Sequence, residues 1–238
     1  MIHSRKFDYS DGQNTFEGVV TYDDATRDNR PIVLVAPTYR GQTEFEEKRA
    51  IRLAELGYIG FAIDTYGKGK RGHTVDEALA LMDTLNQDRS LLLERMQLCL
   101  KVAKSFPMVD TKKIGAMGFC FGGKSVLDLA RSGEELAGIV SFHGVLDPPD
   151  INQDVEIRSK VLVLHGWDDP MATPEQTVAL TQELKRRKAN WELVAYGDTG
   201  HAFTNPAAND KDRGMCYNQL VDDRSWDRMA RFFEEVFA

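Results

Sequence analysis

The residue of this sequence that is best suited to act as a nucleophile is a cysteine flanked by glycines. Cys120 follows the apolar run 114–119, precedes a helix-like segment that starts at Lys124, and has glycines at positions 118, 122 and 123. A nucleophile on the sharp turn between a strand and a helix needs small neighbours, because the turn is strained and both elements pack closely behind it. The same turn places the backbone N–H of Phe121 at the start of a helix, where the helix dipole favours negative charge. The pattern therefore predicts a nucleophilic cysteine on a strand–turn–helix elbow, with the Phe121 N–H placed to stabilise an oxyanion.

Two further loops carry the groups that such a nucleophile needs. Asp168 and Asp169 follow the apolar run that ends at His165, and His201 follows the run that ends at Tyr196. Loops that follow parallel strands gather at the carboxyl edge of a sheet, where ligands bind in open α/β folds. The order Cys, Asp, His along the chain is that of the α/β-hydrolase triad. These three residue types together predict acyl transfer through a covalent intermediate, with no metal or cofactor required.

The remaining cysteines and the strand-end histidines have simpler interpretations. Cys99 lies in the apolar run 96–100 of a helix-like segment, and Cys216 lies in a polar segment near the carboxyl end. Three scattered cysteines without C-x-x-C spacing are not typical of a disulfide framework or a zinc site. His143 and His165 end strand-like runs, and we interpret both as hydrogen-bonded structural residues.

The elements that must position these groups alternate between short apolar runs and helix-spaced segments. Strands are predicted at 31–37, 58–64, 113–119, 137–142, 161–165 and 191–196, and helices at 45–56, 75–104 with an interruption at 86–88, 124–131, 174–188 and 225–237. Apolar runs without alternation indicate strands buried on both faces, as in a parallel sheet between two layers of helices. We therefore predict an α/β fold with an open, mostly parallel, doubly wound sheet and helices on both faces. Segment 16–22 is expected to add an antiparallel edge strand.

Length and charge narrow the class of protein further. The 238 residues are predicted to form a single domain over 1–238, which is long enough to fold without disulfides or a structural metal. A net charge of −7 argues against a nucleic-acid partner. No apolar run is long enough to cross a membrane, and the start of the chain lacks the apolar core of a signal peptide. We therefore expect a cytoplasmic protein that acts on a small molecule, and its oligomeric state stays open.

Three motifs together resemble the dienelactone hydrolase family of α/β-hydrolases. They are the glycine-flanked cysteine at 118–123, the Gly-x-x-Asp-Pro motif at 166–170 and the Gly-His-Ala-Phe motif at 200–203. The resemblance extends to 31–64, 66–69 and 142–144, and the spacing of the motifs fits a compact member without a cap domain. It implies that Cys120 is the nucleophile, His201 the general base and Asp169 the orienting carboxylate. Asp168 is a rival for the last role, and Asp169 is preferred because a proline follows it.

The resemblance also implies further site residues, and it includes two departures. The second oxyanion donor would be the backbone N–H of Tyr39, and Thr38 and Trp167 would contact the substrate. Thr38 stands where well-studied members have a glutamate that helps to activate the thiol, and Asn205 stands where they have an arginine that holds a substrate carboxylate. Activity on an acidic dienelactone is therefore not implied, whereas hydrolysis of another ester, lactone or thioester is. A ligand-binding module without turnover, or a redox-sensing thiol at Cys120, are the alternatives on the same fold.

Overall fold

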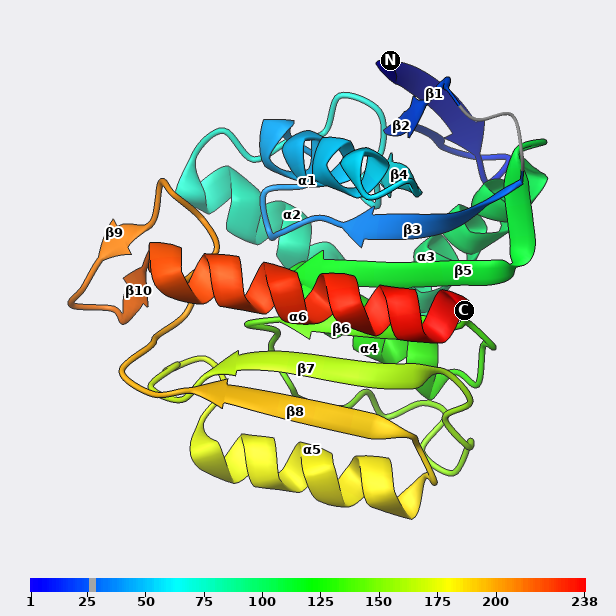
Figure 1. The fold of residues 1–238 in the computed structure, drawn as a ribbon. Coiled ribbons are helices and arrows are strands. Elements are labelled where there is room, and N and C mark those ends of the chain that lie inside the picture. Colours follow the sequence, from blue (N-terminus) through cyan, green and yellow to red (C-terminus); the bar gives the residue numbers. More distant parts are fainter. Residues whose placement is uncertain (26–28) are drawn as a thin grey trace. The chain divides into compact units, whose positions relative to one another are not determined.

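Strands and helices alternate along the described chain, which comprises residues 1–25 and 29–238 of the computed structural model (Figure 1). The chain divides into two units, Met1–Met117 and Gly118–Ala238. The first unit contains β1 (Ile2–Ser10), β2 (Thr15–Asp23), β3 (Arg30–Ala36), α1 (Glu44–Glu55), β4 (Ile59–Ala62), α2 (Val75–Gln87) and α3 (Arg89–Ser105). Strand β5 (Val109–Phe119) begins in the first unit and ends in the second. The second unit continues with α4 (Phe121–Arg131), β6 (Gly138–Phe142), β7 (Lys160–Gly166), α5 (Pro174–Arg186), β8 (Trp191–Tyr196), β9 (Asn209–Asp210), β10 (Met215–Cys216) and α6 (Gln219–Phe237).

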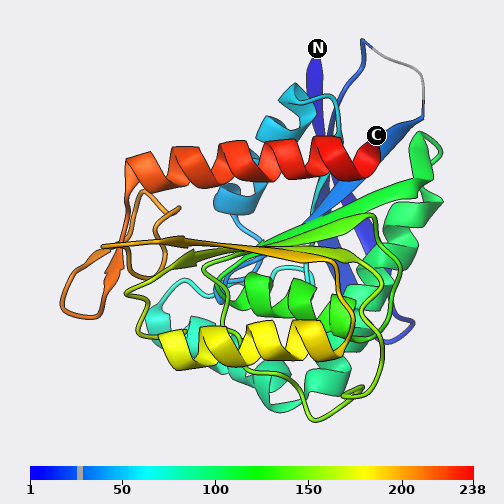
Figure 2. The ribbon, with the colours of Figure 1, turned by 60° about the horizontal axis from the view of Figure 1, so that its bottom comes forward.

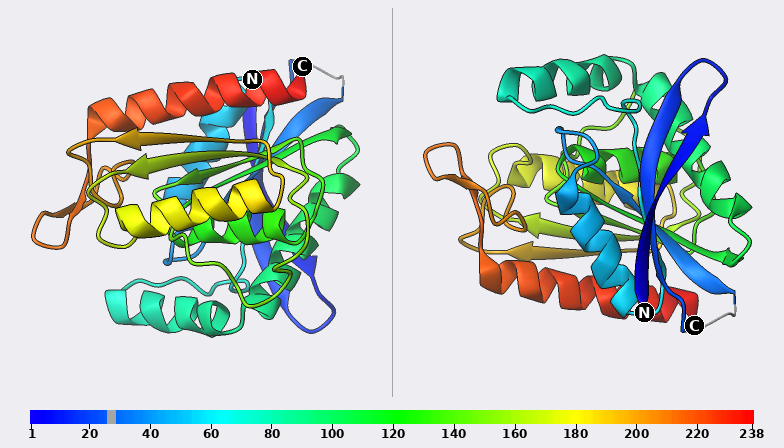
Figure 3. Two further views of the ribbon diagram at one scale, coloured as in Figure 1. Left: turned by 90° about the horizontal axis from the view of Figure 1, so that it is seen from below. Right: turned by 90° about the horizontal axis from the view of Figure 1, so that it is seen from above.

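The first unit joins four of its strands in the order β1-β2-β4-β3. Strands β3 and β4 are parallel, with Ile32 opposite Ile59, and both are almost entirely buried, as predicted for strands covered on both faces. Strand β2 pairs antiparallel with β4, which confirms the expected direction of segment 16–22. Its expected edge position is wrong, because β1 pairs with β2 along nine residues and takes the edge (Figure 3). Strand β1 gave no apolar signal because Tyr9 alone among its residues is buried.

Local capping signals set the helix boundaries of the first unit. Thr43 caps α1, and the Glu46 carboxylate accepts the Thr43 N–H at 2.8 Å, which completes a capping box. The interruption expected at 86–88 is the junction between α2 and α3, where the Asp88 side chain accepts the Leu91 N–H at 2.9 Å. Helix α1 lies directly on β4, since a Cβ on Gly60 would lie 2.4 Å from a backbone oxygen of the helix.

The second unit has the predicted layered arrangement. Strands β6, β7 and β8 run parallel and side by side, with Val140 opposite Leu162 and Leu162 opposite Glu192. Helices α4 and α5 cover one face of these strands and α6 covers the other (Figure 2). The parallel pairing and the helices on both faces confirm the predicted α/β class. Among the described residues, no helix is both long and apolar enough to cross a bilayer.

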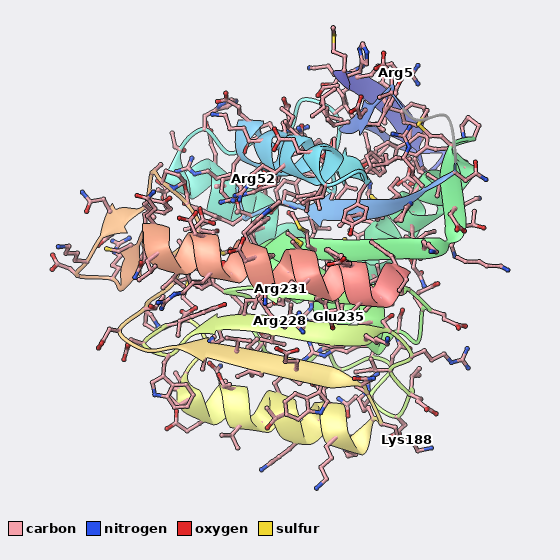
Figure 4. All side chains as sticks on the ribbon, in the orientation of Figure 1. Arg5, Arg52, Lys188, Arg228, Arg231 and Glu235 are labelled. Atoms are coloured by element: carbon pink, nitrogen blue, oxygen red, sulfur yellow. The ribbon has the colours of Figure 1, made fainter. Side chains whose placement is uncertain are left out.

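Helix α6 begins six residues earlier than expected. Its start is set by Asn218, whose side chain accepts the Val221 N–H at 3.2 Å, and not by the apolar periodicity that becomes clear only after residue 225. Arg228 on α6 donates to Glu192 of β8 at 2.8 Å and to Glu235 on its own helix at 3.3 Å (Figure 4). The pair with Glu192 links the helix to the outer strand of the second unit.

Candidate active site

Cys120 occupies the strained turn that the glycine pattern predicts. The residue lies between β5 and α4 with φ +55° and ψ −114°, a conformation that L-residues rarely adopt. Its N–H donates to the Phe142 carbonyl at 3.1 Å, which ties the turn to the end of β6. A Cβ on Gly118 would lie 2.1 Å from the Gly122 oxygen, so strand and helix meet too closely for any side chain there. The glycines therefore allow the close approach that places a nucleophile, here largely buried, at the start of a helix.

The turn at the end of β7 and the loop after β8 bring a carboxylate to the histidine. Asp169 Oδ2 lies 2.7 Å from His201 Nδ1, and both side chains are buried. The other Asp169 oxygen accepts the Met171 N–H at 2.8 Å, which fixes the orientation of the carboxylate. Asp168 faces elsewhere, since its Oδ2 accepts the Thr199 N–H at 3.1 Å. The structure therefore places Asp169 on the imidazole and Asp168 on the backbone of the His201 loop.

The electrostatics of His201 couple the ring to Cys120. Burial alone would lower the pKa of His201, but negative charge on Cys120 and the Asp169 carboxylate raise this pKa to about 10. The His201 Nε2 atom makes no hydrogen bond of standard geometry with the described residues, yet it lies near enough to Cys120 for the sulfur to act on the ring. Catalytic hydrogen bonds are often long in the absence of substrate. The arrangement fits a protonated imidazole that lies between the Cys120 sulfur and the Asp169 carboxylate.

A short hairpin that the sequence did not indicate clamps the backbone of His201. The His201 N–H donates to the Gly214 carbonyl at 2.7 Å, and the Cys216 N–H donates to the His201 carbonyl at 3.2 Å. Both partners belong to the segment of β9 and β10, whose two-residue strands are too short to give a periodic pattern. Gly200 is required beside this clamp, because a Cβ there would lie 2.1 Å from the Gly214 oxygen. Cys216, which the sequence placed in an incidental polar segment, therefore lies in β10 beside the candidate base.

The two strand-end histidines make the hydrogen bonds expected of structural residues. His143 Nε2 lies 2.8 Å from Thr204 Oγ1, and the edge of its ring faces the His201 ring at a centroid separation of 5.0 Å. His165 Nε2 lies 3.1 Å from Thr177 Oγ1, and burial lowers the pKa of His165. These contacts join the ends of β6 and β7 to the His201 loop and to α5. Thr204 had no signal in the sequence, because a threonine in a loop is too common to indicate a site.

Thr38 and Tyr39 lie in the loop after β3 in the first unit. The Thr38 N–H donates to Glu46 Oε1 at 3.1 Å, and the Tyr66 hydroxyl donates to the Tyr39 carbonyl at 3.1 Å. Glu46 is completely buried, and this burial raises the pKa of its carboxyl. The role of Glu46 in holding this loop was missed, although the Thr43-x-x-Glu46 capping-box pattern could have indicated it.

Phe121 and Trp167 are the remaining expected site residues. Phe121 is the first residue of α4, so its N–H lies among the helix-terminal donors that have no partner within the helix. Trp167 follows β7, and its side chain is 42% exposed. No group of three or more His, Cys, Asp or Glu side chains within 1–25 and 29–238 is placed to hold a metal ion.

Comparison with known proteins identifies the family. The model of the dienelactone hydrolase family matches residues 16–237. The chain belongs to the dienelactone hydrolase family. A solved structure of a dienelactone hydrolase-like promiscuous phosphotriesterase from metagenomic libraries is 35% identical, has a TM-score of 0.95, and covers 100% of this chain and 99% of its own.

More distant dienelactone hydrolase relatives agree with this assignment. A Yersinia pestis protein assigned as a carboxymethylenebutenolidase is 24% identical over 216 residues, which are 86% of this chain and 78% of that protein. A structure assigned as a dienelactone hydrolase from Klebsiella pneumoniae is 21% identical, covers 99% of both chains, and shows the same fold with a TM-score of 0.83. The predicted resemblance and the predicted α/β-hydrolase fold are confirmed. This dienelactone hydrolase family member is therefore an ester or lactone hydrolase.

Proposed function

We propose that the protein cleaves a small ester or lactone by acyl transfer through Cys120, with His201 as the general base and Asp169 as its orienting carboxylate. The observation that carries this proposal is the 2.7 Å contact between Asp169 and His201 in the same unit as the elbow cysteine with φ +55°. A nucleophile, a base and an orienting acid are the three groups that acyl transfer of this type requires.

The first half of the reaction forms a thioester. The Cys120 sulfur attacks the carbonyl carbon, a carbon–sulfur bond forms, and the carbonyl electron pair moves onto the oxygen. The backbone N–H of Phe121 at the start of α4 holds this oxyanion, and such a donor contributes roughly 3–4 kcal/mol to lowering the barrier. The tetrahedral intermediate then collapses, the carbon–oxygen bond to the alcohol breaks, and His201 donates its proton to the leaving oxygen.

The second half releases the acid and restores the enzyme. His201, now neutral, takes a proton from water, and the resulting hydroxide attacks the thioester carbonyl. The carbon–sulfur bond breaks, the acid leaves, and the sulfur keeps the electron pair while His201 keeps the proton. The raised pKa of His201, about 10, supports a protonated ring at rest, although burial alone would lower that pKa.

Intact-mass measurement after brief exposure to 4-nitrophenyl acetate tests the nucleophile. We expect one acetyl adduct in the wild-type protein and none in Cys120→Ala. Cys99→Ala and Cys216→Ala are matched controls, and both should keep the adduct because Cys99 is buried in α3 and Cys216 lies in β10. His201→Ala should acetylate and release acid more slowly, by roughly 10²- to 10⁴-fold.

Two results would sink this proposal. One is an adduct that persists in Cys120→Ala, and the other is the absence of turnover on every ester, lactone and thioester tested. In the second case, a sulfenic acid formed at Cys120 by mild peroxide would favour the redox-sensing alternative, and a thermal shift by an ester without product would favour the ligand-binding alternative.

A second candidate activity is the hydrolysis of phosphotriesters. It is favoured by the promiscuous phosphotriesterase whose structure this chain matches over its whole length at 35% identity. Turnover of diethyl 4-nitrophenyl phosphate that disappears in Cys120→Ala would support it, and turnover that is unchanged in this variant would exclude catalysis by the same site.

A further inference from the structure

The residues that directly follow β6, β7 and β8 carry negative charge and no cationic side chain. Segments 143–149, 166–173 and 197–208 contain no Lys or Arg, whereas they contain Asp147, Asp168, Asp169 and Asp198. Cations occur further along the same loops, at positions 158, 211 and 213, and Arg213 lies 3.7 Å from the Asp210 carboxylate. These three segments therefore offer a substrate no fixed positive charge other than the imidazole of the triad.

Three buried basic residues of the same unit are already engaged with carboxylates. Lys124, in the first turn of α4, is buried and pairs with Asp147 at 2.8 Å. Arg131 and Arg187 are buried against Glu183 at 2.7 and 2.8 Å. A buried ammonium or guanidinium in such pairs does not move to a new anion without leaving its own partner uncompensated.

The catalytic groups themselves add no uncompensated positive charge. Burial lowers the pKa of His201, and the charges on Cys120 and Asp169 raise it to about 10. The protonated His201 ring lies 2.7 Å from the Asp169 carboxylate, which offsets its charge. A carboxylate on a bound acyl chain would approach this site from outside and meet repulsion that a partly buried setting screens poorly.

The turn that carries Asp169 also presents two large apolar side chains to solvent. Trp167 is 42% exposed and Met171 is 41% exposed, and each lies two residues from the buried Asp169. The backbone holds both in place, since the Trp167 N–H donates to the Tyr196 carbonyl at 2.9 Å and the Met171 N–H donates to Asp169 Oδ1 at 2.8 Å. Indole and thioether groups form adaptable apolar contact surfaces.

We propose that the site selects neutral esters with an apolar acyl group, that Trp167 and Met171 contact this group, and that esters bearing a carboxylate are poor substrates. This inference rests on the proposed hydrolysis at Cys120 and deepens it by naming the substrate class. Single exposed apolar residues are ordinary on protein surfaces. The inference rests on a combination of two observations. Two exposed apolar residues flank a candidate catalytic carboxylate on one short turn, and the segments directly after β6, β7 and β8 contain no Lys or Arg.

A pair of esters with the same leaving group and the same chain length tests the charge preference. The 4-nitrophenyl ester of hexanoic acid and the mono-4-nitrophenyl ester of adipic acid both have six-carbon acyl chains, and only the second carries a carboxylate. We expect kcat/KM for the hexanoate to exceed that for the adipate by at least tenfold at low ionic strength, with a smaller ratio in high salt. Equal values, or a preference for the adipate, would overturn the inference.

Substitution of the two apolar residues tests their contact with the acyl chain. We expect Trp167→Ala and Met171→Ala each to lower the ratio of kcat/KM for hexanoate to that for 4-nitrophenyl acetate by about threefold to tenfold, chiefly through KM. Trp191→Ala is the matched control, because Trp191 is 37% exposed but opens β8 at the opposite end of the strand, and Val178→Ala on α5 is the control for Met171. An unchanged ratio in both variants, or an equal fall in the controls, would contradict the proposed contact.

The acetate ester separates this inference from the proposed function. Turnover of acetate with no difference between hexanoate and adipate would overturn the substrate class and leave the acyl-transfer proposal standing. No turnover of any of the three esters, together with no adduct on Cys120, would overturn the acyl-transfer proposal and this inference with it.

Discussion

Replacing Asp169 by Asn tests the arrangement around His201 most directly. Asn keeps the size of the buried side chain but removes its charge, so the His201 Nδ1 proton loses its charged acceptor at 2.7 Å. A hydrogen bond to a charged group contributes about 1.5–3 kcal/mol, which corresponds to roughly a 10- to 150-fold effect at about 1.4 kcal/mol per factor of ten. The imidazole must also carry a full positive charge in each tetrahedral transition state. We therefore expect kcat/KM to fall by roughly 10²- to 10⁴-fold.

Asp168→Asn is the matched control for this change. Asp168 is adjacent in sequence, but its carboxylate accepts the Thr199 N–H at 3.1 Å, and the amide oxygen of Asn can accept the same bond. We expect Asp168→Asn to stay within about threefold of the wild-type rate on 4-nitrophenyl acetate, because surface substitutions that keep their hydrogen bonds change little. Unfolding by urea would confirm that both variants are folded.

The two variants should also differ in the titration of His201. The Asp169 carboxylate is one of the groups that raise the pKa of His201 to about 10 against the lowering effect of burial, so Asp169→Asn should lower this pKa and Asp168→Asn should not. Nitrogen-15 spectra of the imidazole across the pH range would show this. The reasoning is refuted if Asp169→Asn stays within tenfold of wild type, or if Asp168→Asn gives the larger loss.

Three further predictions concern the same unit. Cys120→Ala should lower the pKa of His201, because it removes the largest cause that raises this pKa against burial; imidazole NMR would show it, and an unchanged value would contradict the coupling. The pKa of His201 in the folded protein, about 10, is above its unfolded value of about 6.5. Protonation of His201 therefore stabilises the wild-type fold fully below pH about 6.5, and this stabilisation is lost as the pH rises towards 10. Urea unfolding from pH 7 to about 10 should show a smaller loss of unfolding free energy in His201→Gln than in the wild-type protein. Glu183→Ala leaves the buried Arg187 without its carboxylate partner, while Arg131 keeps its pair with Asp128, and should cost about 3–5 kcal/mol of unfolding free energy. The exposed Glu235→Ala should cost less than about 1 kcal/mol.

The strands buried on both faces could be predicted from the sequence because their apolar runs are continuous. Strands β3, β4, β6, β7 and β8 fall within two residues of their expected bounds. Burial on both faces leaves a run of apolar residues that needs no knowledge of the partner strand. Strand β1 is exposed along most of its length, so no run of apolar residues predicts it or its pairing with β2. Because β1 was not predicted, β2 was expected at the edge of the sheet.

Cys120 and its glycines were visible in the sequence because the constraint is local. A Cβ at position 118 would meet the backbone only four residues along the chain, so the requirement for glycine is met within one short motif. The distinction between Asp168 and Asp169 is less local, because both residues belong to one turn and have the same chemistry. It is decided by hydrogen bonds to the loop after β8, where Asp168 meets Thr199 and Asp169 meets His201. The proline that follows Asp169 accompanies this turn, but it does not hold either carboxylate in place.

The support of His201 depends on contacts that no local pattern encodes. The backbone of His201 is held from both sides by residues 214 and 216, and its ring meets the His143 ring from another strand end. Ala202, the next residue, has φ +59°, which costs energy for a residue with a Cβ and persists only when the surroundings enforce it. The hairpin of β9 and β10 holds this backbone through main-chain hydrogen bonds. Main-chain groups are the same for every residue type except proline, so these bonds place little constraint on which residues occur in the hairpin. A position whose function is exerted through its N–H or carbonyl therefore leaves almost no trace in the sequence. Here the glycine at 200 records that the two backbones meet, because a Cβ there would lie 2.1 Å from the Gly214 oxygen.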